Sequence, residues 1–111
     1  MVDPESNSTS IVGRRMRERR EALGLAQEKI GVVIGIDESS SRARISRYEL
    51  GVHEPPLPTA RLIANVMGAP LAYLYCDDDK VAELLLALHQ LGNVARGQKV
   101  QEFLGKLQQG K

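Results

Sequence analysis

The sequence predicts an all-α fold, and three observations support that prediction. Apolar residues recur every three or four positions along most of the chain, as they do on one face of a helix. Gly24, Gly51 and Gly68 follow periodic segments at the points where a helix would end. The 111 residues include three Tyr, one Phe and no Trp. A core built from Leu, Ile, Val, Ala and Met suits closely packed helices.

Composition and charge narrow the class of protein. The formal net charge is only +1, but residues 14–20 hold five Arg against one Glu, so positive charge is concentrated locally. Cys76 is the only cysteine, which excludes an internal disulfide and a thiolate metal site within one chain. No apolar run has the length of a membrane span, and residues 1–10 lack the order of a signal peptide. We therefore expect a cytoplasmic protein without a membrane partner.

The first two predicted helices precede the basic centre of the chain. Hydroxyl side chains at residues 8–10 can cap a helix that begins near Ile11 and ends at Gly24. One side of this helix carries Val12, Met16, Arg20 and Leu23. A second helix is predicted over residues 27–34. Residues 32–36 stay ambiguous, because their β-branched side chains also favour a short strand.

A basic helix is predicted up to Gly51. Ile45 and Tyr48 lie three residues apart and so share a packing face, whereas Arg47 and one of the two earlier arginines, at 42 and 44, point elsewhere. Taken alone, this pattern fits an ordinary solvated exterior as well as a nucleic-acid contact.

Four further segments follow. Prolines at 55, 56 and 58 force an extended connection, after which residues 58–67 form a helix. Its inward residues are Ala60, Ile63, Ala64 and Met67. A short helical turn is predicted over 71–75, and residues 77–79 supply carboxylates that cap a helix over 80–91. That helix has more apolar surface than one neighbour can cover, and a last amphipathic stripe runs from Val100 to Leu107.

The segments 20–31, 35–36, 45–51 and Pro55 resemble the Cro and phage-repressor-like (XRE-type) helix-turn-helix family over roughly residues 11–75. The resemblance implies a lambda-repressor-like, five-helix DNA-binding domain whose third helix enters the major groove. It implies base contacts by Arg42, Ala43 and Arg47, to which we add Ser40 and Ser41. It also implies phosphate contacts by Gln27, and we assign the same role to Arg44, Arg14 and Arg15. Arg20 and Glu49 match the family's ion pair between the first and third helices.

The sequence departs from the family pattern at three places. The connection from Gly35 to Ile45 is four residues longer than usual, close to one helical turn, so it can lengthen the third helix at its N-terminus while nearly preserving its facing. Asp37 or Ser39 would then cap that helix. Ala26 stands where the family favours a capping hydroxyl. Val32 and Val33 replace polar residues, and either the inserted turn covers them or they form a contact surface.

These observations predict three segments: a flexible arm at 1–10, a helix-turn-helix DNA-binding domain at 11–76, and C-terminal helices at 77–111. We expect the last segment to form a dimer interface, made by Leu84, Leu85, Leu88, Leu91, Phe103, Leu104 and Leu107. The expected function is a bacterial or phage regulator, a repressor, that binds a palindromic operator in double-stranded DNA as a homodimer. The alternative is a protein-interaction module on the same fold, such as an antitoxin subunit or a regulator whose C-terminal helices bind a partner protein.

An enzyme is not expected, because the chain has no phosphate-binding Gly loop, nucleophile elbow or carboxylate pair of suitable spacing. His53 and His89 lack partners at metal-ligand spacing, so we expect no metal and no cofactor. We interpret Cys76 as a small buried group at a helix junction.

Overall fold

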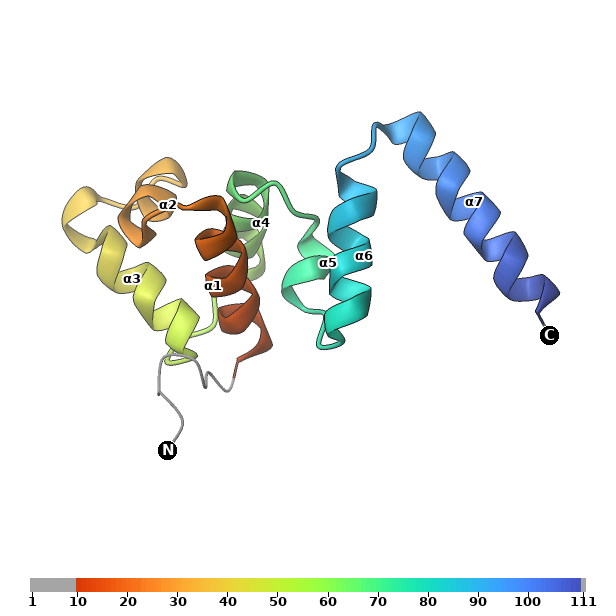
Figure 1. Cartoon of the computed structure of the whole chain (residues 1–111). Coiled ribbons are helices and arrows are strands. Elements are labelled where there is room, and N and C mark those ends of the chain that lie inside the picture. Colours follow the sequence, from red (N-terminus) through yellow and green to blue (C-terminus); the bar gives the residue numbers. More distant parts are fainter. Residues whose placement is uncertain (1–9, 111) are drawn as a thin grey trace.

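The computed structural model describes residues 10–110, which form seven α-helices and no strand (Figure 1). The predicted all-α class is therefore confirmed. The predicted arm lies outside the described residues except for Ser10. The helices are α1 (Ile11–Leu23), α2 (Gln27–Val33), α3 (Glu38–Leu50), α4 (Leu57–Val66), α5 (Leu71–Leu74), α6 (Asp79–His89) and α7 (Asn93–Gln109).

Helices α1 to α5 surround a single apolar core. Its largest fully buried apolar side chains come from all five helices and from the turn after α4, and they are Met16, Ile30, Ile45, Ile63, Leu74 and Met67. The inward residues predicted for α4 are all buried. Helices α2 and α3 pack closely against each other, and α1 crosses α3 (Figure 1). This arrangement holds α3 on a rigid support.

The helix ends follow from local chemistry. Ser10 Oγ accepts a hydrogen bond from the Gly13 amide, and Asp37 accepts one from the Ser39 amide at the start of α3. Gly24 and Gly51 take left-handed conformations, with φ of 69° and 79°, and end α1 and α3. The ambiguous segment 32–36 completes α2 and turns into α3 without forming a strand.

The four extra residues before Ile45 become the first turn of α3, as predicted, and α3 is 13 residues long. This turn does not cover the two valines that precede it. Val32 and Val33 remain 44% and 53% exposed. Ala26 precedes α2 without a side-chain capping bond, as the sequence indicated.

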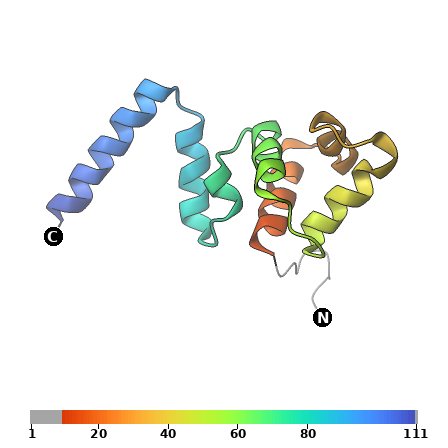
Figure 2. The same ribbon diagram turned by 180° about the vertical axis from the view of Figure 1, so that it is seen from behind.

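Helix α6 packs beside α5, whereas α7 projects away from the other helices in both views (Figures 1 and 2). Ala82 is buried, and Leu86 packs against the core cluster. No residue of α7 is buried. None of the helices within residues 10–110 is long and apolar enough to cross a membrane.

Candidate nucleic-acid interface

Helix α3 separates a packing face from an exposed face. Ile45, Tyr48 and Glu49 are buried against the other helices. Arg42 and Arg47 are exposed, and so is Ala43. The arginines and alanine that the family resemblance assigns to base contacts therefore reach the surface from one continuous helix.

The buried Glu49 carboxylate connects three helices. Arg20 Nε donates to Glu49 Oε2 at 2.7 Å, and Arg20 Nη2 donates to Oε1 at 3.0 Å. Gln27 Nε2 also donates to Oε1 at 3.0 Å. The predicted ion pair between α1 and α3 is therefore present. Its hydrogen bonds to Glu49 raise the pKa of Arg20, so the guanidinium stays charged at any physiological pH.

Close backbone approach fixes the crossing of α1 over α3. A Cβ atom on Gly13 would lie 2.5 Å from the carbonyl oxygens of both Tyr48 and Glu49. Neither of these backbone atoms can move without shifting α3, so residue 13 must lack a side chain. The last turn of α3 is therefore held against α1 both by this contact and by the ion pair of Arg20.

A polar hollow of about 480 Å³ lies beside the exposed face of α3. It is lined by side chains from α1, the start of α2, and α3, among them Arg17, Gln27, Arg42 and Ser46. Neither Arg17 nor Ser46 was predicted as a site residue. Ser46 follows Arg42 by four residues, a spacing that places both on one side of a helix and could have identified it.

Ser40 and Arg44 lie on the other flank of α3. Both line a second hollow of about 310 Å³, together with Asp37, Thr59 and apolar side chains. Arg44 is exposed there. Its predicted contact with phosphate remains a prediction, as does the role of Ser40 in base contact.

The predicted base contact by Ser41 is wrong. Ser41 is fully buried, and its hydroxyl donates to the Glu28 carbonyl oxygen at 2.7 Å. Ser41 precedes Ile45 by four residues and Tyr48 by seven, so it shares their inward face. It meets α2 at Gly31, where a Cβ atom would lie only 1.9 Å from Ser41 Oγ.

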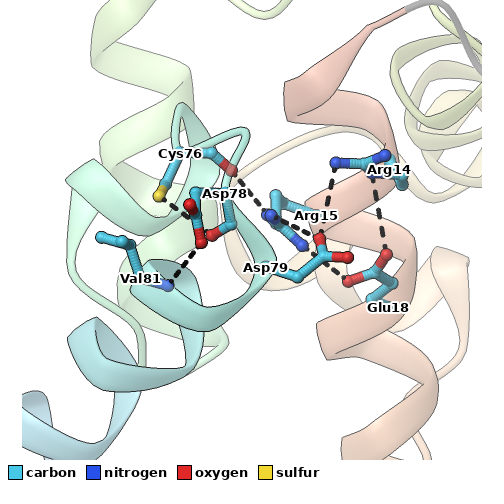
Figure 3. Close-up of polar contacts among 7 residues, drawn as sticks. All are labelled: Arg14, Arg15, Glu18, Cys76, Asp78, Asp79 and Val81. Atoms are coloured by element: carbon cyan, nitrogen blue, oxygen red, sulfur yellow. Dashed lines mark hydrogen bonds and ion pairs between the residues drawn. The ribbon is translucent and has the colours of Figure 1, made fainter.

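The predicted phosphate contact by Arg15 is also wrong. Arg15 is only 2% exposed and belongs to a cluster that joins α1 to the start of α6 (Figure 3). Its Nε donates to the Cys76 carbonyl oxygen at 2.8 Å, and Nη2 donates to Asp79 Oδ1 at 3.0 Å. Burial alone would lower the pKa of Arg15, but hydrogen bonds to Asp79 and Glu18 outweigh burial and raise it. The positive charge of Arg15 is therefore paired with carboxylates of the protein itself.

Other residues of this cluster also lie where α1 meets the start of α6. Arg14 lies 3.7 Å from Asp79 and 3.8 Å from Glu18, so a phosphate would compete with two carboxylates for it (Figure 3). Asp78 caps α6 by accepting from the Val81 amide at 3.0 Å, as predicted for the acidic run. The Cys76 thiol is half-buried and donates to the Asp78 carbonyl oxygen.

A helix-turn-helix family model matches residues 16–74, more than half of the chain. The chain belongs to the XRE-type helix-turn-helix family. The members of this family are DNA-binding transcriptional regulators, and the family is not a class of enzymes. The match runs from within α1 to the end of α5, the helices that support and include the exposed face of α3.

Relatives of this XRE-type protein are also named as regulators. An uncharacterized HTH-type transcriptional regulator of Sinorhizobium medicae (strain WSM419) is 32% identical over 66 residues, which span 60% of this chain and 45% of that protein. An uncharacterized transcriptional regulator in the ATPase CF(0) region of Rhodospirillum rubrum is 34% identical over 80 residues, covering 67% and 70% of the two chains. The chain thus spans less than half the length of the first relative.

A solved structure extends the similarity past the matched helix-turn-helix region. The crystal structure of the transcriptional regulator BswR superimposes with a TM-score of 0.76 and 34% sequence identity. The superposition covers 85% of this chain and 92% of that chain. The superposition therefore includes residues of this chain outside the segment 16–74.

Proposed function

We propose that this protein is a transcriptional repressor that binds a two-fold symmetric operator as a homodimer, with α3 in the major groove. The exposed face of α3 carries the proposal, because Arg42 and Arg47 extend from a helix whose opposite face is packed into the core. In this family the major groove receives a helix presented in this way. Repression then requires only that the bound dimer occupy the operator.

Base contacts are assigned to Arg42, Ala43 and Arg47, with Ser40 at the N-terminal end of α3. A guanidinium can bond O6 and N7 of guanine together, and one such pair contributes about 1–3 kcal/mol of discrimination between bases. Phosphate contacts are assigned to Gln27 and Arg44, which flank the exposed face. Arg17 joins them in place of Arg15, because it lines the hollow that adjoins Arg42.

The homodimer is proposed from the apolar surface of the C-terminal helices. Leu84, Phe103, Leu104 and Leu107 are between 38% and 59% exposed. Leu85, Leu88 and Leu91 are only partly covered. A two-fold dimer places two recognition helices about 34 Å apart, one turn of DNA, which gives more specificity than a single half-site.

The alternative function, a module that binds another protein, is favoured by the same uncovered surface of α7. Size-exclusion chromatography with light scattering distinguishes the two. A purified chain that remains a monomer would support the alternative, whereas a dimer supports the operator-binding regulator.

Selection of bound oligonucleotides from a random pool, repeated at two salt concentrations, tests the proposed function. A sequence-specific dimer should enrich an inverted repeat at both concentrations, because base contacts persist while the electrostatic attraction to phosphates weakens with salt. Recovery of unrelated sequences at the higher salt concentration would reject operator binding.

The role of Arg47 gives a sharper prediction. Arg47→Ala should weaken binding to the selected operator by about 10-fold or more, because it removes one side-chain contact with a base. The same substitution should weaken binding to bulk DNA much less. Gln27→Ala should weaken both alike, because a phosphate contact is independent of sequence. Arg61→Ala, which removes an exposed arginine from α4, controls for charge alone. Equal losses on both DNAs for Arg47→Ala would contradict its assignment.

A further inference from the structure

Helix α6 has two opposite apolar faces. Ala82 and Leu86 lie against the core of the DNA-binding domain. Leu84 and Leu88 lie on the other side, where they line an apolar groove of about 460 Å³ between α6 and α7. The remaining residues that line this groove are Ala87, Leu91, Lys99, Glu102, Phe103 and Lys106. The second face of α6 therefore has no covering helix within residues 10–110.

The apolar stripe of α7 does not fill this groove. Of the four stripe residues, only Phe103 lines it. Val100, Leu104 and Leu107 are 37%, 45% and 59% exposed. At about 100° per residue, this stripe is turned roughly a quarter-circle away from the side of α7 that faces the groove. In proteins most helical stability comes from packing of an apolar face, and the stripe of this 17-residue helix is largely uncovered.

Arg96 joins the start of α7 to the end of α6. Its Nε donates to the Leu88 carbonyl oxygen at 2.9 Å, and its Nη2 donates to those of His89 and Leu91 at 3.1 and 2.7 Å. These carbonyls belong to the end of α6 and the connection after it, where helix carbonyls lack intrahelical donors. Among the described residues, no other α7 side chain makes a polar contact with α1–α6. One guanidinium thus makes all the polar side-chain contacts between α7 and the end of α6 in this part of the chain.

The uncovered faces of the two helices match in length, and charged residues of both signs border the groove. The α6 face has apolar residues at 84, 87, 88 and 91, and the α7 stripe has them at 100, 103, 104 and 107. Both follow the spacing i, i+3, i+4 and i+7 and span about 10 Å. The groove also carries Lys99 and Lys106 together with Glu102, so a second copy of the same chain brings charges of both signs to the contact.

We propose that the dimer forms by exchange of α7, with the α7 stripe of each copy lying in the α6–α7 groove of the other. The exchange covers both uncovered faces at once and satisfies two-fold symmetry, because each copy supplies one helix and one groove. This inference rests on the homodimer of the proposed function and specifies how it is built. Arg96 is the positioning residue that presents the groove.

Charge substitutions across the predicted contact test the exchange. Leu88→Glu and Leu104→Lys should each raise the dissociation constant of the dimer by about 100-fold, since each places a charge in an apolar contact. The chain with both changes should bind at least about 10-fold more tightly than either single variant, because each introduced Glu then faces an introduced Lys of the other copy. Analytical ultracentrifugation measures the constants. Thermal unfolding of each variant verifies that the DNA-binding domain remains folded.

A control and two outcomes complete the test. Gln98→Lys adds the same charge on the side of α7 away from the stripe and should leave the dissociation constant within about 3-fold of the original. A dimeric parent chain whose double variant is no tighter than the single variants would overturn the exchange, because pairing of α7 with α7 would bring Lys against Lys. That result leaves the homodimer intact. A monomeric parent chain would instead overturn the homodimer and the exchange together.

Discussion

At the scale of single residues, the Glu49 carboxylate joins three helices of the domain. It is 2% exposed and accepts hydrogen bonds from Arg20 and Gln27. Glu49→Ala should lower the free energy of unfolding by about 3 kcal/mol, because it leaves the Arg20 guanidinium partly buried without its counter-charge. Urea denaturation monitored by circular dichroism measures this loss.

A double-mutant cycle checks that the loss comes from the pair. Arg20→Ala should destabilise the protein by a similar amount, and the chain carrying both changes should lose less than the sum of the two. Strictly additive losses would show that Arg20 and Glu49 act independently and would contradict the interpretation.

The arginines of α1 show why the sequence predicted only part of the interface. Charge alone favoured phosphate contact for Arg14 and Arg15, yet a helix turns about 100° per residue. Arg15 and Arg17 therefore point about 160° apart, one toward α6 and one toward the hollow beside α3. The partners of Arg15 are at 76 and 79, too far along the chain for local spacing to indicate. By contrast, the resemblance located the pair of Arg20 and Glu49 because both positions belong to its motif.

At the scale of helices, the crossing of α2 and α3 depends on Gly31. Gly31→Ala should destabilise the domain by about 1–3 kcal/mol, because the new Cβ atom would collide with Ser41 Oγ and overpack the crossing. Differential scanning calorimetry would detect the loss. Adding Ser41→Ala should recover part of it by removing the hydroxyl. A more stable Gly31→Ala protein would mean that the higher helix propensity of Ala outweighs the contact, contrary to this prediction.

Most helices could be predicted because periodicity and glycine stops are local signals. The start of α3 was predicted from the one-turn length of the insertion and from Asp37 or Ser39 as its cap, and Asp37 takes that position. The inward position of Ser41 was missed, although its spacing from Ile45 and Tyr48 contained that information. The polarity of Ser41 favours the surface, whereas its helical phase places it inside. A buried hydroxyl that bonds a backbone carbonyl is stable in such a position.

At the scale of the whole molecule, the cluster around Arg15 attaches the C-terminal helices to the DNA-binding domain. Asp79→Ala should loosen the start of α6, so that the dimer presents its two α3 helices less rigidly. Binding to an operator with two half-sites should weaken by about 10-fold relative to binding of a single half-site, because the effective concentration of the second contact falls. Fluorescence anisotropy with both DNAs measures the ratio.

Asp77→Ala provides the matched control. It removes a neighbouring exposed carboxylate that has no ion pair or hydrogen bond within residues 10–110. The ratio of the two affinities should be unchanged in this variant. A similar change in the ratio for Asp77→Ala and Asp79→Ala would attribute the effect to net charge rather than to the attachment of α6.

The sequence predicted the all-α class and the surplus of apolar surface after residue 80. It did not predict how α6 and α7 are oriented, because that depends on Arg15 and Arg96, whose partners are backbone carbonyls and a distant carboxylate. Every residue has a backbone carbonyl, so the order of side chains does not indicate which carbonyl accepts the hydrogen bond. The limits proposed for the domains and the identity of the base-contacting residues likewise remain predictions.

The absence of any buried residue in α7 has a consequence for how the regulator responds to its own abundance. If its apolar stripe is covered only after association, free chains at low concentration leave the operator largely vacant. While such unassociated chains predominate, the amount of competent dimer varies with the square of the total, so halving synthesis would reduce it roughly fourfold. Cells could thereby switch the controlled genes by a modest change in expression, without a small-molecule signal.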